Sequence, residues 1–182
     1  MTLTFEAGNS SGRVVATGSG EAAGIGGYSG AHCGAIVINS GKVNATAGSG
    51  VDDFYDGGSA GIGSSCGKRC DGITIHKGEI IAIGAAGAAG IGTGSMGICN
   101  NDNGGTLPAI TINISSYSDG WVKATKGSGA TYFIGGGTEA KCGIVTVGGK
   151  TYADGNRRGI TSSTSLSDDF SIYENTLTYL PW

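Results

Sequence analysis

The segment Ala-Gly-Ile-Gly occurs at residues 23–26, 60–63 and 89–92, and Phe133-Ile134-Gly135-Gly136 is a degenerate fourth copy. Two other segments recur with it in a fixed order. One is a strand-like segment with two apolar residues two positions apart, and the other reads x-(Val/Ile/Thr)-x-Ala. The first is found at Leu3/Phe5, Ile36/Ile38, Ile73/Ile75, Ile110/Ile112 and Val145/Val147, and the second at residues 13–16, 42–45, 79–82, 121–124 and 150–153.

The alanines that end the second segment give the length of each repeat. Ala16, Ala45, Ala82, Ala124 and Ala153 are separated by 29, 37, 42 and 29 residues. A constant unit with inserts of variable length is typical of a solenoid, because the stacked core stays fixed while insertions fall in loops.

The periodicity within each segment predicts strands. Apolar residues recur every second position, so alternate side chains point to opposite faces. Three short strands per unit predict an all-β, three-sided, right-handed parallel β-helix of about five coils over residues 1–154. Its internal rows would be Ile36/Ile73/Ile110, Val43/Ile80/Val122 and Ile25/Ile62/Ile91/Ile134. Outward positions would be Val37, Thr74, Thr111 and Thr146 on the first strand, and Val15, Asn44, Ile81, Lys123 and Tyr152 on the second.

The composition supports a folded scaffold. Glycine supplies 38 of 182 residues and proline only two, which excludes collagen. The regular Ile and Val argue against a disordered linker. We expect the repeat glycines at sharp corners or close backbone contacts. A phosphate-binding loop would need a following helix or a Gly-Lys-Ser/Thr segment, and neither follows any of the Ala-Gly-Ile-Gly segments.

Charge and hydropathy limit the kinds of partner that the protein could bind. The net charge is −3 and no basic patch stands out, which argues against nucleic acid. No apolar run approaches the roughly 18–20 residues of a membrane span. The first residues already have a strand pattern, so we expect no signal peptide.

Five cysteines are present. Cys33, Cys70 and Cys142 each stand just before a repeat strand, whereas Cys66 and Cys99 lie in irregular segments. The spacing does not match a zinc site. Two interpretations stay open: at least one disulfide in an extracellular protein, with its pairing undefined, or buried apolar thiols.

The repeat units also carry a resemblance. Ala-Gly-Ile-Gly with Ile-Thr-Ile and Gly-x-Val-x-Ala-Thr resembles the glycine-rich repeat of bacterial secreted and surface proteins and of phage adhesins and tail fibres. The resemblance covers roughly residues 2–154. It implies a carbohydrate-binding, pectate-lyase-like right-handed β-helix, located outside the cell or on a virion, whose partner is a cell-surface or extracellular polysaccharide. The inserts at 47–59 and 93–108 depart from the repeat.

The two ends of such a solenoid need covering, because an open end exposes apolar side chains and unpaired strand edges. Residues 155–182 break the repeat, and we expect Phe170, Tyr173, Tyr179 and Trp182 to cap the C-terminal end. An oligomer contact or attachment segment is the alternative. The N-terminal end has no evident cap, so a neighbouring domain or a second subunit would cover it.

The two inserts contain oxygen-rich segments. Asp52, Asp53 and Asp56 could bind calcium, since calcium takes six to eight oxygen ligands. Asn101 and Asp102 form a second candidate calcium site. A solvated acidic loop and a tight Asn/Asp/Gly turn are the respective alternatives.

Aromatic residues at predicted loop and turn positions are the candidate sugar contacts: Tyr28, Phe54, Tyr55, Tyr117, Trp121 and Tyr132. Local packing is the alternative for each. The predicted outward strand positions carry no carboxylate, whereas a glycosidase needs a rigid carboxylate pair. We therefore expect no catalytic residues and a non-catalytic glycan-binding or structural module. A polysaccharide lyase or hydrolase, a protein that assembles end to end and an ice-binding threonine face are the alternatives.

Overall fold

The computed structural model describes residues 1–6, 12–28, 30–49, 57–96, 109–152 and 159–182. Within these ranges the regular structure consists of β-strands and one short 3-10 helix, η1 (Tyr117–Asp119). The strands form three mostly parallel sheets, named A, B and C below. None of the helical structure in the described ranges is long and apolar enough to cross a membrane. The protein is therefore all-β, as predicted.

Each sheet collects strands from widely separated parts of the chain. In sheet order, sheet A contains β1 (Thr2–Phe5), β4 (Ala35–Ile38), β7 (Ile73–Ile75), β10 (Ile110–Ile112), β13 (Val145–Val147) and β14 (Lys150–Tyr152). Sheet B contains β2 (Arg13–Thr17), β5 (Lys42–Thr46), β8 (Gly78–Ile83), β11 (Gly120–Thr125), β17 (Thr176–Tyr179) and β16 (Phe170–Tyr173). Sheet C contains β3 (Ile25–Gly26), β6 (Ile62–Gly63), β9 (Ile91–Gly92), β12 (Ile134–Gly135) and β15 (Gly159–Ile160).

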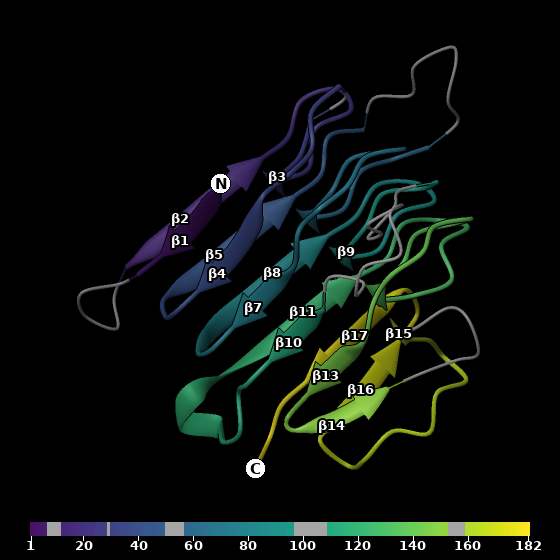
Figure 1. Ribbon diagram of the computed structural model, residues 1–182. Helices are drawn as coiled ribbons and strands as arrows, with labels where there is room; N and C mark the ends of the chain where they lie inside the picture. Colours follow the sequence, from purple (N-terminus) through teal and green to yellow (C-terminus); the bar gives the residue numbers. More distant parts are fainter. Residues whose placement is uncertain (7–11, 29, 50–56, 97–108, 153–158) are drawn as a thin grey trace.

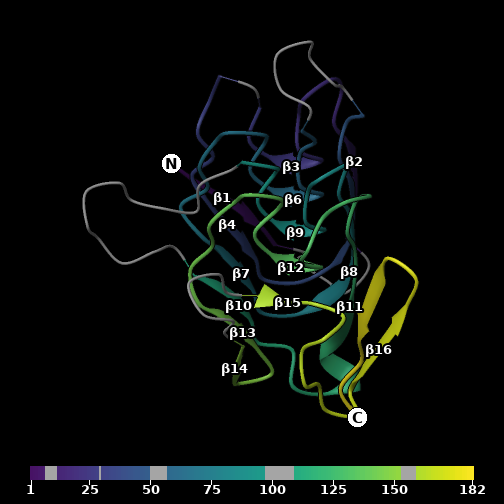
Figure 2. The ribbon, with the colours of Figure 1, turned by 90° about the vertical axis from the view of Figure 1, so that its right-hand side faces the viewer.

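From β1 to β12 the chain passes through sheets A, B and C in turn, four times. Each strand pairs in parallel with its equivalent from the previous pass, which Figure 1 shows as an oblique stack from the N-terminus to the C-terminal strands. Figure 2 shows the short strands of sheet C one below another. This topology is compatible with a parallel β-helix.

The core consists of apolar rows that run across the coils. The paired positions include Ile36, Ile73 and Ile110 in sheet A, Val43, Ile80 and Val122 in sheet B, and Ile25, Ile62, Ile91 and Ile134 in sheet C. All of them are buried. The three predicted rows are confirmed, because β-branched residues at alternate positions bury one face of each strand.

A column of glycines lies beside the isoleucine row of sheet C. Gly26, Gly63, Gly92, Gly135 and Gly159 are paired from strand to strand, with φ of 132°, 137°, 135°, 137° and 153°. A Cβ at Gly92 would overlap the carbonyl oxygen of Gly135, and one at Gly63 would overlap that of Gly92. The second glycine of Ala-Gly-Ile-Gly is therefore required by backbone conformation and by close packing of coils.

The repeat pattern predicts that residues 150–153 form a fifth equivalent strand in sheet B, and this prediction is wrong. Residues 150–152 form β14, which turns back and pairs antiparallel with β13 in sheet A. Gly148 and Gly149 connect the two strands with φ of 56° and 78°. Two consecutive residues with positive φ are typical of a tight hairpin turn that reverses the chain. Tyr152, predicted to point outward, is consequently buried.

The C-terminal hairpin takes the place of the missing strand. β17 pairs antiparallel with β11, so that Leu177 and Tyr179 lie opposite Ala124 and Val122. Leu177 and Tyr179 are buried, and the Phe170 ring lies 4.7 Å from the Tyr179 ring. Phe170 and Tyr179 therefore extend the core at this end.

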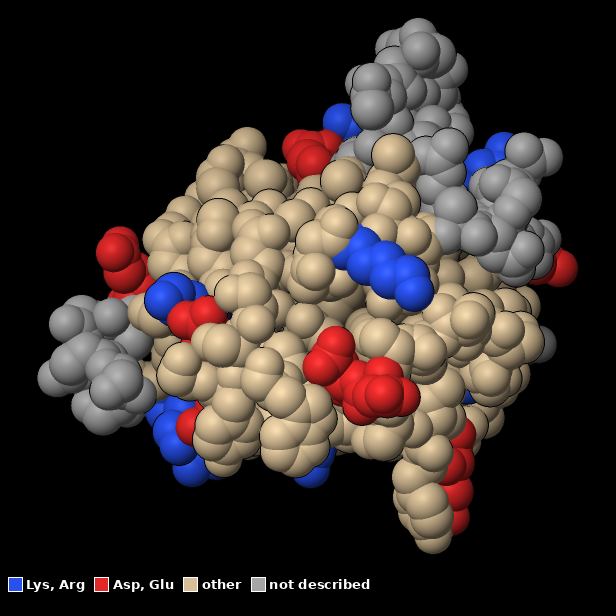
Figure 3. Space-filling view, turned by 90° about the horizontal axis from the view of Figure 1, so that it is seen from below, with Lys and Arg blue, Asp and Glu red and all other residues tan. Residues whose placement is uncertain are grey.

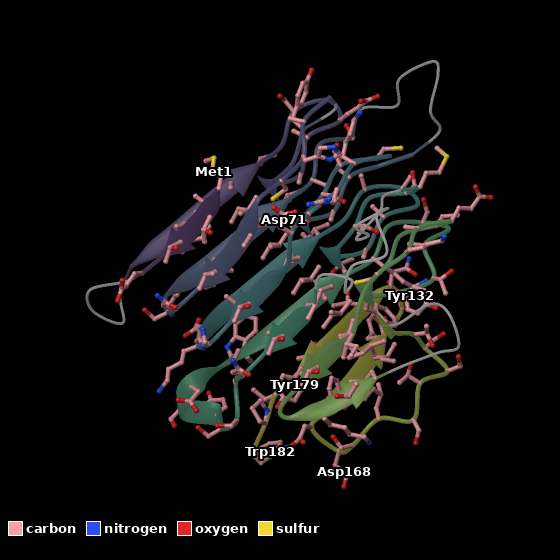
Figure 4. The ribbon with its side chains drawn as sticks, in the orientation of Figure 1. Met1, Asp71, Tyr132, Asp168, Tyr179 and Trp182 are labelled. Atoms are coloured by element: carbon pink, nitrogen blue, oxygen red, sulfur yellow. The ribbon has the colours of Figure 1, made fainter. Side chains whose placement is uncertain are left out.

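Two of the four aromatic residues expected in the cap do not cover the core. Tyr173 is 77% exposed and Trp182 is 85% exposed. Figure 4 shows Trp182 near the end of the chain, apart from the strands of sheet B. At the opposite end, β1, β2 and β3 are the terminal strands of their sheets among the described residues, and Leu3 is exposed.

The glycine column gives a first test of the fold. Gly92→Ala introduces a Cβ that overlaps Gly135 in a backbone conformation that only glycine adopts easily, and we expect it to lower the unfolding free energy by about 3 kcal/mol or more. Gly129→Ala is the control, since Gly129 also has positive φ (76°) but no atom lies within 4 Å of its added Cβ. It should cost only about 1–2 kcal/mol. Urea denaturation measures the unfolding free energy of both variants, and equal losses in Gly92→Ala and Gly129→Ala would contradict the close contact at Gly92.

Burial, with the charge of Asp169, raises the pKa of Tyr179 to about 12 from its ordinary 10.0. The unfolded chain then ionises Tyr179 before the folded chain does. The unfolding free energy should fall as the pH rises from 10 to 12. Tyr179→Phe should reduce this slope, after a loss of about 1 kcal/mol at neutral pH for the hydrogen bond to Ile114 O. The exposed Tyr173→Phe is the control, and denaturant titrations at each pH measure the effect.

Candidate functional site

A groove lies at the corner where the chain passes from sheet A to sheet B. The connections β4–β5, β7–β8 and β10–β11 all turn on the same side of the stack, and η1 projects from the last of them (Figure 1). The groove has a volume of about 240 Å³. Its side chains include Lys42, Lys77, Glu79, Tyr117, Asp119 and Trp121. Residues from three coils therefore meet at one surface depression.

Hydrogen bonds to Asp119 fix the turn that presents Tyr117. The Asp119 carboxylate accepts hydrogen bonds from Ser116 Oγ at 3.0 Å and from Ser115 Oγ at 3.2 Å. The Asp119 N–H donates to Ser116 O at 2.9 Å, closing the 3-10 turn. Tyr117 lies within this turn and is 66% exposed. The polar sequence Ser-Ser-Tyr-Ser-Asp thus holds an aromatic side chain in solvent at the groove.

Two ion pairs set the electrostatics of the groove. Lys42 Nζ lies 3.0 Å from Glu79 Oε2, and Lys77 Nζ lies 2.7 Å from Asp119 Oδ1. The hydrogen bond from Lys77, aided by those from the two serines, holds the pKa of Asp119 below its ordinary 3.8. Both pairs are accessible to solvent, where such pairs contribute little to stability. Their donors and acceptors are therefore available to a polar ligand.

Trp121 lies in a row of outward residues on sheet B. The register places Arg13, Lys42, Glu79 and Trp121 side by side on β2, β5, β8 and β11. Four adjacent strands span about 14 Å at the usual strand spacing. Lys123 Nζ lies 5.4 Å from the centre of the Trp121 ring, within the range of a cation–π contact. Trp121 is half-buried, so part of the ring stays accessible.

Two further depressions adjoin the groove and share Lys42 with it. One, of about 350 Å³, extends past Arg13 to Phe5 at the N-terminal end of the stack. The other, of about 190 Å³, lies over Asn44, Ile81 and Trp121 on sheet B. Charges of both signs are interspersed over the face seen in Figure 3. The corner is therefore an elongated surface of mixed charge.

The predicted sugar contacts have different outcomes. Tyr117 and Trp121 line the same groove. Tyr28 is exposed but follows β3 of sheet C and does not line the groove. The expectation of an accessible Tyr132 ring is wrong: the side chain is only 1% exposed, and its ring atoms lie where a Cβ on Gly159 would be. Phe54 and Tyr55 lie outside the described residues.

The predicted calcium ligands Asp52, Asp53, Asp56, Asn101 and Asp102 all lie outside the described residues. Within the parts of the chain that the structure does describe, no three His, Cys, Asp or Glu side chains are grouped to hold a metal ion.

Sequence reasoning missed the charged side chains of the groove. Like the predicted Trp121, the charged residues Arg13, Lys42 and Glu79 occupy the first position of an x-(Val/Ile/Thr)-x-Ala segment, so the four residues begin the first four of the five segments. That position faces outward beside the corner, so an alignment of the repeats could have identified the row. Asp119 and Lys77 lie in connections of different length, and no repeat position relates them.

No protein family model, curated protein or solved structure matches this chain. Any assignment of function therefore depends on the geometry of the groove.

The Lys77–Asp119 pair gives a test of that geometry. Lys77→Met removes the first cause of the lowered pKa, so the midpoint of Asp119 ionisation should rise toward 3.8. NMR titration of the Asp119 carboxyl carbon measures the shift. Lys123→Met is the control, because that ammonium contacts Trp121 instead. A midpoint unaffected by Lys77→Met would contradict the pair.

Proposed function

We propose that this protein is a non-catalytic recognition module that binds an extended polysaccharide along the groove between sheets A and B. The scaffold is a right-handed, three-sided parallel β-helix. Parallel strands joined by crossover connections are right-handed in nearly all proteins, which supports this handedness. The module acts outside the cell, as part of a surface adhesin or a phage fibre.

The observation that carries the proposal is the pairing of Tyr117 and Trp121 in one groove with Lys42, Glu79, Lys77 and Asp119. A sugar ring has apolar C–H faces that pack on aromatic rings, and hydroxyl groups that need donors and acceptors at its edge. Binding sites commonly combine such apolar surfaces with a few placed polar groups. Aromatic side chains on turns held by a rigid scaffold suit recognition of this kind.

The elongated shape of the corner favours a polymer over a single sugar. The three depressions share Lys42 and extend from Phe5 to Trp121. Binding of several consecutive sugar units would use weak contacts at each coil. Rigid coils reduce the entropy lost on binding, because the groove is already formed.

The carboxylates of the groove favour binding over catalysis. A glycosidase needs one carboxylic acid with a raised pKa to protonate the leaving group. The pKa of Asp119 is instead lowered by Lys77, and Glu79 is paired with Lys42. The Asp119 carboxylate therefore suits hydrogen bonding to hydroxyl groups better than proton transfer.

A fibre that continues the parallel ladder from copy to copy is a weaker alternative. Such a fibre needs a strand edge at each end that accepts a parallel partner. At the C-terminal end, antiparallel strands β14, β15 and β17 occupy the edges of β13, β12 and β11. This change from parallel to antiparallel pairing favours a module with a defined length.

A glycan array with the full chain and its variants tests the proposal. We expect the wild type to bind a subset of polysaccharides, and Tyr117→Ala and Trp121→Ala each to weaken binding by about tenfold or more, the usual effect of removing a central aromatic contact. Tyr28→Ala and Tyr173→Ala are matched controls, since both remove exposed aromatic rings away from the groove. Both controls should bind as the wild type does.

Three results would contradict the proposal. The first is equal binding by the groove variants and the controls, and the second is no binding to any glycan. The third is release of reducing ends or unsaturated products when the wild type is incubated with a bound polysaccharide, which would indicate a lyase or hydrolase.

A further inference from the structure

We propose that Cys33 and Cys70 form a redox-active dithiol that closes to a disulfide between two neighbouring coils. Both residues lie at the corner where the chain passes from sheet C to sheet A, one just before β4 and the other just before β7. Asp71, labelled in Figure 4, marks this corner beside the strands of sheet A. The inference is independent of the groove and of its ligand.

The backbone of the two residues has the separation that a disulfide requires. Cys33 and Cys70 form an isolated parallel β-bridge in direct register. The Cys33 N–H donates to Arg69 O at 2.7 Å, and the Asp71 N–H donates to Cys33 O at 3.2 Å. Adjacent strands lie about 4.8 Å apart. This value is within the roughly 4.4–6.8 Å range of Cα separations in disulfides.

The two thiols also point to the same place. Cys33 Sγ lies 3.2 Å from Gly34 O, and Cys70 Sγ lies 3.4 Å from the same oxygen. Cys33 is 8% exposed and Cys70 is 0% exposed. Because both sulfurs share one acceptor inside the corner, rotation of the side chains can bring them into bonding contact.

The pair is electronically asymmetric. A hydrogen bond from the Cys33 thiol lowers the pKa of Cys70, and the same bond raises the pKa of Cys33. Cys70 is therefore the thiol of the pair that ionises more readily. Thiolates are the attacking species in thiol–disulfide exchange.

The oxidant is a small disulfide such as glutathione disulfide. It reaches Cys33, the more exposed of the two residues. Cys33 loses its proton to solvent, and the resulting thiolate attacks the small disulfide, forming a mixed disulfide and expelling one small thiolate, which takes up a proton. The Cys70 thiolate then attacks the Cys33 sulfur and expels the second small thiolate, which takes up a proton from solvent. The two protein sulfurs lose two electrons in total, and the oxidant is reduced to two thiols.

The other described cysteines lack this arrangement. Cys66 Sγ lies 3.3 Å from Ser95 Oγ. Cys142 is buried just before β13. Neither forms a β-bridge with another cysteine in the described ranges. Cys142→Ser is therefore a matched control for a buried thiol at the equivalent place in the repeat.

The test equilibrates the reduced full chain with graded mixtures of reduced and oxidised glutathione, followed by alkylation in denaturant and tryptic mapping. Trypsin separates Cys33 (residues 14–42), Cys66 (43–68) and Cys70 (70–77). We expect a cross-link between the first and third peptides in the wild type and in Cys142→Ser. Cys33→Ser and Cys70→Ser should instead give only a mixed disulfide with glutathione. The oxidised wild type should also melt at a higher temperature than the reduced protein.

Two outcomes would overturn the proposal. The first is full alkylation of both Cys33 and Cys70 after equilibration with oxidised glutathione, including in mild denaturant that admits the reagent. The second is a cross-link that joins either residue to a different cysteine. Tryptic mapping of the wild type alone detects both, so the conclusion does not depend on the folding of the variants.

Discussion

Backbone-to-backbone contact along the glycine column of sheet C sets the distance between coils for the whole molecule. One chain passes through all three sheets in every coil, so the spacing at one corner must equal the spacing at the others. A side chain at Gly63 or Gly92 would overlap the carbonyl oxygen of the next glycine. The hydrogen-bonded spacing of sheets A and B therefore depends on a corner that contains no Cβ atoms.

The same spacing produces both the groove and the cysteine pair for which a role is proposed. It aligns Arg13, Lys42, Glu79 and Trp121 in one row. At another corner it places Cys33 directly opposite Cys70 in a β-bridge. Neither arrangement needs residues that are close in sequence. A change in the coil spacing would separate the ion pair between Lys42 and Glu79 and the two thiols together. The scaffold thus determines the geometry, and the outward side chains determine the chemistry.

The sequence was sufficient for the regular part of the fold because each inward position repeats. It failed at Lys150–Tyr152, whose local pattern matches the second segment of the other coils. Two features direct this segment to β13 in sheet A: the Gly148-Gly149 turn, and the pairing of β11 with the strand that contains Leu177 and Tyr179. The turn is visible in the local sequence, whereas the pairing with a strand so far along the chain is not. At the site, the sequence indicated Tyr117 and Trp121 as separate candidate contacts, but not that they line one groove. Tyr132 was misassigned because its burial depends on packing against the distant Gly159.

The two ends of the stack differ in a way that constrains how the module is connected. At the C-terminal end the terminal strands β14, β16 and β15 are antiparallel to their neighbours, whereas at the N-terminal end the terminal strands β1, β2 and β3 pair in parallel. Unpaired strand edges favour pairing with another chain or segment. The depression lined by Phe5 and Arg13 lies at this same N-terminal end and joins the groove through Lys42. A domain or subunit that covers the N-terminal end would therefore border the groove and lengthen the surface available to a polymeric ligand.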